Sequence, residues 1–363
     1  MKIGKPVEAW KLEIITQRET ILRDLPREAA IESLEPIPCP SWNAIFRARS
    51  STHQYCLKIM NEESVATRWR MQELDYIGNV VNSLYHSGLR YLTPPVVLET
   101  GRCAFLCAGY KAVLFPWSDD PAGVADRECF ARVAAPVLFR LHSAGRTVVQ
   151  SANEPGTSIS RKLGPKAWAC HAAALWDESA RDLAANGTPS DVITALVRLS
   201  SQVSAVTAQF PEFFAPSCDE RTILHGDFRP ENVSINGDRV SRVFDFDFMR
   251  LGLPEEDLAY SALSYSCAGW FSGSCDWQAC AAFINCYRRT ARAHGFEVRA
   301  SLLEAALYWV ILKELSLSFR PHEVPSRCKL FHDLREHMGY LLNARETSPG
   351  RRLILTGAAP AGS

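Results

Sequence analysis

The chain has 363 residues, of which 47% are hydrophobic and 22% are charged, a composition typical of a folded globular protein and not of a disordered one. Its 40 basic and 40 acidic side chains cancel, which argues against a nucleic-acid-binding protein and against a polybasic membrane-binding protein. A chain of this length is expected to form about two domains.

Cysteine usage and the first residues indicate a protein of the cytoplasm. The opening sequence, MKIGKPVEAWKLE, contains no apolar signal segment. The 12 cysteines are scattered, and none has the paired CxxC spacing of a zinc site. The most apolar segment, 302–319, carries Glu304, Lys313 and Glu314, which favours a buried helix over a membrane span. We therefore expect reduced thiols, a cytoplasmic location and no membrane partner.

The first third of the chain predicts a helix followed by strands. Residues 1–30 mix charged and apolar positions as a leading helix does, and the segment EPIPCP at 35–40 ends it. Residues 42–60 predict a β-hairpin with the polar turn SSTHQ in its middle. A helix is expected over 62–87, followed by three more strands in VVLE, CAFLC and KAVLF. The prolines and acidic residues of 116–121 then mark a domain boundary.

The rest of the chain is mostly helical in pattern. A short β-prone island lies at 222–248, and the last residues, 346–363, predict a loose tail. Helical patterns occupy 127–142, 165–185, 189–209, 276–295 and 298–319. The predicted fold class is therefore α+β, with a strand-rich lobe at 1–115, a hinge at 116–120 and a larger helical lobe at 121–345.

The segment ILHGDFRPENVSINGDRVSRVFDFDFMR, residues 223–250, carries the most informative chemistry. Asp227 is followed five residues later by Asn232, and Asp245 comes after two β-prone runs. Asn236-Gly237, a strong hairpin turn, joins these two runs. Because a hairpin brings its two ends together, we expect Asn232 and Asp245 to lie close to Asp227.

Three oxygen-bearing side chains at one point suit phosphoryl transfer. Asp227 is placed to accept or orient the proton of an attacking hydroxyl, and Asn232 with Asp245 supplies hard oxygen ligands for Mg²⁺. Protein kinases have H-R-D-x-x-x-x-N and D-F-G where this chain has HGDFRPEN and DFD. The alternative is that HGD and DFD are turn residues flanking an ordinary hairpin. That alternative leaves acidic side chains among phenylalanines, which is costly unless they are paired or metal-bound.

The first lobe offers a cation for the phosphates of a nucleotide. Lys58 lies in the middle of the apolar strand YCLKIM. Glu73 falls on the apolar stripe of the helix that follows, together with Ile77 and Val81. Kinases pair a strand lysine with a helix glutamate, so we predict an ion pair between Lys58 and Glu73. The alternative is a solvated lysine and a glutamate at the edge of the stripe.

Together these motifs resemble the aminoglycoside phosphotransferase and choline kinase-like family, which has the bilobal protein-kinase-like fold. The specific matches cluster in 224–260. The residues that carry the resemblance are Lys58, Glu73, Leu141-His142, His225-Gly226-Asp227 through Asn232, Phe244-Asp245-Phe246 and Asp257-Leu258-Ala259.

The resemblance implies ATP and Mg²⁺ as cofactors and Asp227 as the catalytic base. It also implies Asn232 and Asp245 as magnesium ligands and Lys58, held by Glu73, on the phosphates. The other residues implied are Leu114, Phe115 and Trp117 at the adenine and Asp257 as a structural support of the catalytic loop.

One departure from the family pattern concerns the nucleotide. No glycine-rich loop precedes Lys58, because PCPSWN at 38–43 occupies its place. Without glycines the backbone cannot approach phosphates in the usual way. Ser41 and Asn43 are therefore candidate side-chain donors to the phosphates.

A second departure concerns the acceptor. Gly226 stands where protein kinases have Arg, and only nine residues separate Asp245 from Glu255. This spacing leaves no room for a long activation segment. A small-molecule acceptor therefore fits better than a protein serine.

Several further residues have more than one interpretation. His225 is expected to brace the catalytic loop through hydrogen bonds, and His142 to be a satisfied helix residue. Asp247 is a second metal ligand, an acceptor contact or, by default, a loop residue. Among the tryptophans, only Trp117 has a position that suggests adenine contact.

The sequence thus predicts an ATP- and Mg²⁺-dependent kinase that phosphorylates a hydroxyl of a small metabolite or antibiotic. The alternatives are a catalytically idle, kinase-shaped binding module and an aminoglycoside-modifying resistance enzyme. Zero net charge makes a polycationic acceptor less favoured, and no nucleic-acid partner is expected. The sequence selects neither the acceptor nor an oligomeric state.

Overall fold

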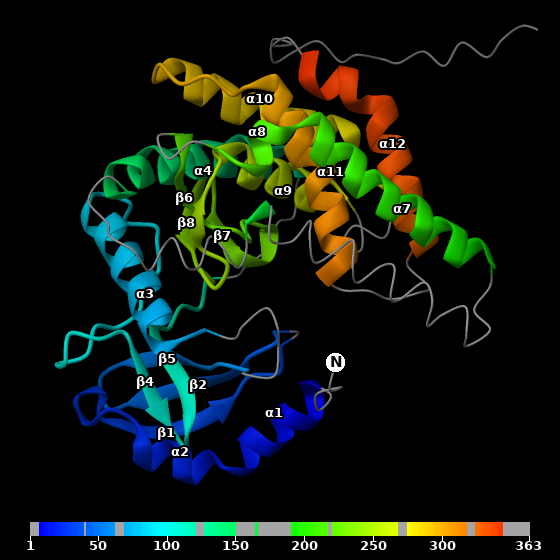
Figure 1. Cartoon of the computed structure of the whole chain (residues 1–363). Coiled ribbons are helices and arrows are strands. Elements are labelled where there is room, and N and C mark those ends of the chain that lie inside the picture. Colours follow the sequence, from blue (N-terminus) through cyan, green and yellow to red (C-terminus); the bar gives the residue numbers. More distant parts are fainter. Residues whose placement is uncertain are drawn as a thin grey trace, which may run out of the picture.

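The computed structural model describes residues 7–39, 41–61, 69–120, 127–149, 164–165, 190–216, 220–267, 274–317 and 324–343. Figure 1 shows a sheet-bearing lobe, blue to cyan, below a larger lobe of helices coloured green to red. This arrangement confirms the predicted α+β class and its two lobes.

Five strands form an antiparallel sheet in the first lobe, in the order β1-β2-β3-β5-β4. The strands are β1 (Ile31–Pro36), β2 (Ala44–Ser50), β3 (Gln54–Ile59), β4 (Ala104–Cys107) and β5 (Tyr110–Pro116). The hairpin predicted at 42–60 is confirmed as β2 and β3.

Two strand assignments in this lobe differ from the prediction. The sequence predicts a break at 35–40, but Ile31–Pro36 form strand β1 at the edge of the sheet, where a terminal proline such as Pro36 is tolerated. The segment VVLE after Pro95 forms no strand, and Val96 instead donates its N–H to the Leu114 carbonyl at 2.8 Å.

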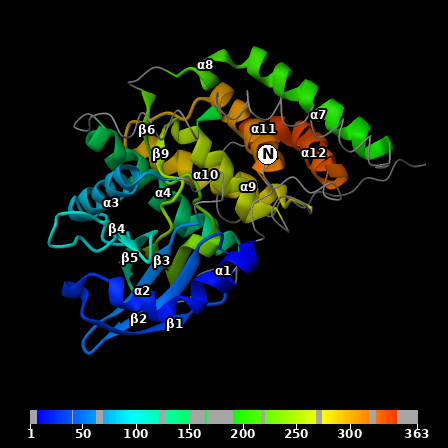
Figure 2. The same cartoon turned by 60° about the horizontal axis from the view of Figure 1, so that its bottom comes forward.

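Side-chain alternation along β3 gives the sheet two different faces. Leu57 and Ile59 pack into a core with α1 (Val7–Thr16) and α2 (Arg18–Asp24), the two helices that take the place of the single predicted leading helix. Figure 1 shows these helices below the sheet, on the side away from the larger lobe, and Figure 2 turns this side of the molecule forward. Lys58, between the two apolar residues, therefore points to the opposite face, towards the larger lobe.

Helix α3 (Met71–His86) connects the lobes in packing as well as in sequence. It begins later than the predicted start at 62, and 62–68 lie outside the described residues. Its buried side chains, including Leu74, Ile77 and Val81, belong to the hydrophobic core of the larger lobe. Gly88, with φ of +113°, follows its end as predicted.

The larger lobe contains the helices expected at 127–142, 189–209, 276–295 and 298–319. The pattern at 165–185, apart from Pro165, and the tail at 346–363 lie outside the described residues. The helices are α4 (Arg127–Val149), α7 (Ser190–Gln209), α8 (Pro211–Phe214), α9 (Pro254–Ser266), α10 (Trp277–Ala293), α11 (Ala300–Leu317) and α12 (Val324–Asn343).

Helix α9 was not predicted as a helix. Nearly every side chain on it is buried, so it shows no apolar stripe against a polar face. Its start is nevertheless encoded, because Pro254 occupies a first-turn position and the Glu256 carboxylate accepts the N–H of Leu253 at 3.0 Å.

Two short strand pairs carry the functional segment of this lobe. β6 (Thr222–Leu224) pairs with β9 (Arg250–Gly252), and β7 (Val233–Asn236) pairs with β8 (Arg239–Val243). The second pair confirms the predicted hairpin, with Gly237 at φ +64° in its turn. The boundary at 116–120 stays a prediction.

Eight cysteines are free: Cys39, Cys56, Cys103, Cys107, Cys267, Cys275, Cys280 and Cys286. The described residues include no helix that is both long and apolar enough to cross a membrane.

Candidate active site

The chain turns sharply between β6 and Asp227, and the turn requires glycine. Gly226 has φ of +80°, and a Cβ at this position would lie 2.2 Å from the Phe248 carbonyl oxygen. An arginine with its Cβ does not fit in that space. The glycine that replaces the kinase arginine is therefore a condition for folding the loop this way.

Donor groups hold the Asp227 carboxylate in a fixed orientation. Tyr260 donates its hydroxyl to Oδ1 at 2.5 Å, and Asn232 donates Nδ2–H to Oδ2 at 2.8 Å. The Nε of Arg229 lies 3.2 Å from the same Oδ2. The carboxylate side chain is 9% exposed. The loop thus presents one oriented carboxylate with a guanidinium beside it.

His225 braces this loop as expected. Its Nε2 lies 3.0 Å from the Phe244 carbonyl oxygen, and its Nδ1 accepts the N–H of Asp227 at 3.2 Å. One nitrogen must donate and the other must accept, so the contacts assign a neutral imidazole with its proton on Nε2. Burial lowers the pKa of His225, which favours the same neutral form.

Asp257, at the start of α9, supports the loop from below. Its carboxylate accepts the backbone N–H of His225 at 2.6 Å and that of Gly226 at 2.9 Å. His142 Nε2 lies 3.2 Å from the same carboxylate, and Tyr287 closes the network with its hydroxyl 2.6 Å from His142 Nδ1. Burial acts to raise the pKa of Asp257, but the contact with His142 holds it below its usual value.

Asp245 follows β8 with an unusual backbone. Its φ is +65°, a conformation that costs a non-glycine residue energy and that concentrates at functional sites. The Asn232 carbonyl accepts the N–H of Phe244 at 3.1 Å, which places Asp245 beside the loop that carries Asp227 and Asn232. The structure thus brings Asp227, Asn232 and Asp245 together as the hairpin predicted.

Lys58 reaches across from β3 to two aspartates of the larger lobe. Its ammonium lies 2.7 Å from Asp245 Oδ1 and 2.6 Å from Asp247 Oδ2. Burial acts to lower the pKa of Lys58, but these two carboxylates raise it, so the side chain is charged. Burial together with the Asp245 carboxylate raises the pKa of Asp247 to about 6, although Lys58 opposes this shift.

The predicted ion pair between Lys58 and Glu73 is not formed. Glu73 is buried in the first turn of α3, where its carboxylate accepts the N–H of Arg70 at 2.8 Å. This capping contact keeps the carboxylate at the helix end. The two aspartates after β8 take the lysine instead.

Asn43 links the loop before β2 to the larger lobe. Its Nδ2 donates to Asp247 Oδ2 at 2.9 Å, and its Oδ1 accepts the N–H of Asn61 at 3.0 Å. Ser41 Oγ accepts the N–H of Asn43 at 3.1 Å. Asn43 was expected to donate to phosphates, but its amide is buried and engaged at both ends.

The residues expected at the adenine lie at the end of β5. The Leu114 carbonyl accepts from Val96, and Trp117 donates its backbone N–H to Gln54 at 3.0 Å. The Trp117 ring is covered by the Arg47 guanidinium, 4.6 Å from its centroid. Phe115, half-buried, packs against the core of the larger lobe.

The residues between the lobes fit a magnesium ion bound with a nucleotide. Asn232 uses its Nδ2 on Asp227, which leaves its amide oxygen as an available acceptor, and Asp245 is 30% exposed at its side chain. No group of three His, Cys, Asp or Glu side chains arranged to hold a metal occurs in the described ranges. Mg²⁺ needs only one or two protein ligands when phosphates and water complete its shell.

Sequence reasoning missed three residues of the site: Arg229, Tyr260 and the role of Asp247. Each carried a local signal. Arg229 follows Asp227 by two residues, and Asp247 follows Asp245 by two. Tyr260 lies three residues after Asp257, on the same face of a helix that was not predicted.

Several solved structures share this fold. An aminoglycoside phosphotransferase from Alicyclobacillus acidocaldarius has a TM-score of 0.57 at 13% identity, covering 90% of this chain and 94% of its own. An ethanolamine kinase from Plasmodium vivax has a TM-score of 0.56 at 13% identity, covering 91% and 90%. The amicoumacin kinase hAmiN, in complex with AMP-PNP and Ca²⁺, has a TM-score of 0.55 at 12% identity, covering 89% and 93%.

At these identities the structures establish the protein-kinase-like fold alone. No curated protein matches this chain. A family model described as the phosphotransferase enzyme family matches residues 91–293, which include the Asp227 loop, the β7–β8 hairpin and both aspartates that follow it. The chain therefore belongs to the phosphotransferase enzyme family.

Proposed function

We propose that this protein transfers the γ-phosphoryl group of ATP to a hydroxyl group of a small molecule, with Mg²⁺ bound to the nucleotide. The observation that carries the proposal is the oriented, buried carboxylate of Asp227 beside Asn232 and Asp245, with Lys58 facing them from the other lobe. Phosphoryl transfer needs positioning and charge neutralisation, and these side chains supply both.

Asp227 is the residue that handles the proton of the acceptor. The acceptor oxygen attacks the γ-phosphorus, its proton passes to the Asp227 carboxylate, and the bond from the γ-phosphorus to the bridging oxygen of ADP breaks. Tyr260 and Asn232 hold the carboxylate towards the acceptor. The guanidinium of Arg229, next to it, provides positive charge near the transferring group.

Lys58, Asn232 and Asp245 bind the nucleotide side of the reaction. Lys58 would contact the phosphates, and Asn232 with Asp245 would hold Mg²⁺, which would supply positive charge to the phosphate oxygens. Asp247 positions Lys58 in place of a helix glutamate, because it shares the ammonium with Asp245. The backbone at the end of β5, near Phe115, would meet the adenine.

No observation favours an idle binding module, because the carboxylates that such a module can lose are all assembled. The acceptor is a small molecule, and proteins of the same fold include an ethanolamine kinase and an amicoumacin kinase. Amino alcohols and hydroxyl-bearing antibiotics, together with sugars and aminoglycosides, therefore form the first panel of acceptors.

The test is ATP consumption with this panel, followed by the variant Asp227→Asn. The variant should lower turnover by about 10³-fold or more, because it removes the carboxylate that takes the proton. Its binding of Mg-ATP, measured as a rise in melting temperature, should be unchanged.

Asp238→Asn is the matched control, since Asp238 is an exposed residue of the β7–β8 turn. It should keep full turnover. Full turnover in Asp227→Asn would refute the assignment of the base. No melting shift with millimolar Mg-ATP in the unaltered protein would instead favour the idle module.

A further inference from the structure

A second, charged pocket lies in the larger lobe, on the far side of the network that supports the catalytic loop. It is open to solvent, with a volume of about 240 Å³. A narrow inner recess behind it, with room for about one water molecule, reaches His142 and Tyr287. The described residues that line the open part are Arg146, Glu220, Pro254, Glu255, Glu297 and Arg299.

Glu255 is an unusual residue in this wall, because it is buried with half of its carboxylate unused. The side chain is only 3% exposed. Oε1 accepts the backbone N–H of Arg299 at 3.2 Å, while Oε2 has no hydrogen-bond partner within the described structure. A buried carboxylate oxygen without a donor is costly, so this oxygen is poised for a donor group of a ligand.

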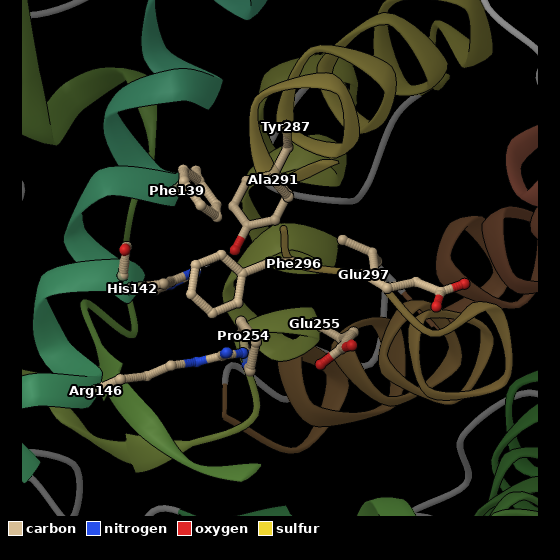
Figure 3. Close-up of a pocket in the computed structure, with 11 residues that line it drawn as sticks. Phe139, His142, Arg146, Pro254, Glu255, Tyr287, Ala291, Phe296 and Glu297 are labelled. Atoms are coloured by element: carbon tan, nitrogen blue, oxygen red, sulfur yellow. Dashed lines mark hydrogen bonds between the residues drawn. The ribbon is translucent and has the colours of Figure 1, made fainter. Parts of the chain in front are cut away.

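Arg146 brings the opposite charge to the same pocket. Figure 3 shows Arg146 reaching the pocket from α4 and Glu255 from the start of α9. The guanidinium lies over the Phe296 ring, 4.5 Å from its centroid. Across the ranges that the structure describes, no ion pair joins Arg146 to Glu255, although both line the pocket.

The remaining charges leave a mixed field and not one of a single sign. Arg299 is committed to Glu220, with the two side chains 2.5 Å apart. Glu297 is exposed at the rim. A simple anion meets three glutamates here, and a simple cation meets two arginines, so neither is well matched to the whole pocket.

We propose that this pocket binds a small zwitterion of the amino-acid class, with its ammonium group on Glu255 and its carboxylate on Arg146. Such a ligand supplies the donor that Oε2 lacks and gives the guanidinium a planar carboxylate partner. Pro254 gives the open part an apolar side, and Phe296 lines the inner recess beneath the Arg146 guanidinium. The site is separate from Asp227 and does not depend on the proposed phosphotransferase activity.

The first experiment compares three probes on the full chain by ligand-observed NMR titration. Glycine carries both charged groups, methylamine carries the ammonium alone, and acetate carries the carboxylate alone. Glycine should bind at millimolar concentration. Methylamine and acetate should each bind at least about tenfold more weakly than glycine, because each lacks one of the two charge-assisted contacts.

The second experiment places glycine in this pocket. Glu255→Gln and Arg146→Gln should each weaken glycine binding about tenfold, because each removes one of the two charges. Glu212→Gln, at an exposed position on α8, should leave glycine binding unchanged.

The proposal is overturned by any of three results: no glycine binding at millimolar concentration, acetate or methylamine binding as tightly as glycine, or glycine binding retained in both pocket variants. If Glu255→Gln does not fold, the three-probe comparison on the unaltered chain still decides the outcome.

Discussion

The two halves of the candidate site, the Asp227 loop and the Lys58 side, are held in place in different ways. The catalytic loop is supported entirely within the larger lobe, where Asp257 accepts the N–H groups of His225 and Gly226. Lys58, on the opposite side, finds its carboxylate partners in the other lobe, 187 residues away in sequence in the case of Asp245. One side is preorganised by local contacts, and the other depends on how the lobes meet.

This difference indicates whether a substitution on each side changes the free energy of folding or the use of the nucleotide. Breaking the support of the loop leaves backbone donors buried without acceptors, which costs folding free energy as well as activity. Removing a carboxylate partner of Lys58 leaves the core of each lobe intact and changes the position of one charged side chain. Substitutions on the two sides should therefore separate into effects on stability and effects on nucleotide use.

Asp257→Asn should have the largest effect on stability. The new side-chain NH₂ group would point at a backbone N–H that needs an acceptor. We therefore expect the free energy of unfolding to fall by about 3 kcal/mol and turnover to be lost. Asp276→Asn is the matched control, because Asp276 caps α10 and asparagine caps a helix equally well. Urea unfolding measures both. A loss below about 0.5 kcal/mol in Asp257→Asn would show that the loop is not held there.

Asp247→Asn should act on nucleotide use more than on stability. The substitution removes one of the two carboxylate charges that pair with Lys58, so we expect kcat/KM for ATP to fall about 100-fold. Glu73→Gln should change it about twofold or less, since glutamine also serves at this position of a capping box. Steady-state kinetics on both variants compares the two carboxylates directly. The reverse order of effects would restore Glu73 as the partner of Lys58.

The same two sides differ in how well their residues could be predicted from the sequence. The grouping of Asp227, Asn232 and Asp245 was predictable because a hairpin with a strong turn joins them. The partner of Lys58 was not predictable. The contact between β3 and the segment after β8 depends on how the two lobes are placed, and lobe placement produces no periodic pattern in the sequence.

The fold was predictable to a similar degree. The β2–β3 hairpin and the amphipathic helix α10 carry strong patterns. Helix α9 is buried on nearly every face, and β1 ends in Pro36, so neither has the pattern of its type. Both were missed for that physical reason, and α9 positions two residues of the site, Asp257 and Tyr260.

Asn43→Ala, also on the Lys58 side of the site, should have a smaller effect than Asp247→Asn. It removes the contact from the loop before β2 to Asp247 and the acceptor for the Asn61 N–H. We expect KM for ATP to rise about tenfold with little change in kcat, because the loop would no longer be held over the phosphates. Ser41→Ala, which removes an acceptor within the loop, should raise it less. Equal KM values in all three proteins would mean that this loop does not contribute to nucleotide binding.

The smallest predicted effect is a pH dependence on the preorganised side. Burial lowers the pKa of His225 in the folded state, whereas in the unfolded chain its pKa is about 6.5. Below that pH the unfolded state binds more protons than the folded state, so stability falls as pH falls, and protonation of Nδ1 would set a donor against the Asp227 N–H. Urea midpoints measured from about pH 7 to pH 5 should decline, and the decline should be shallower in His225→Gln. His332→Gln, at an exposed position, should retain the full slope, and an equally steep slope in His225→Gln would assign the pH dependence to other groups.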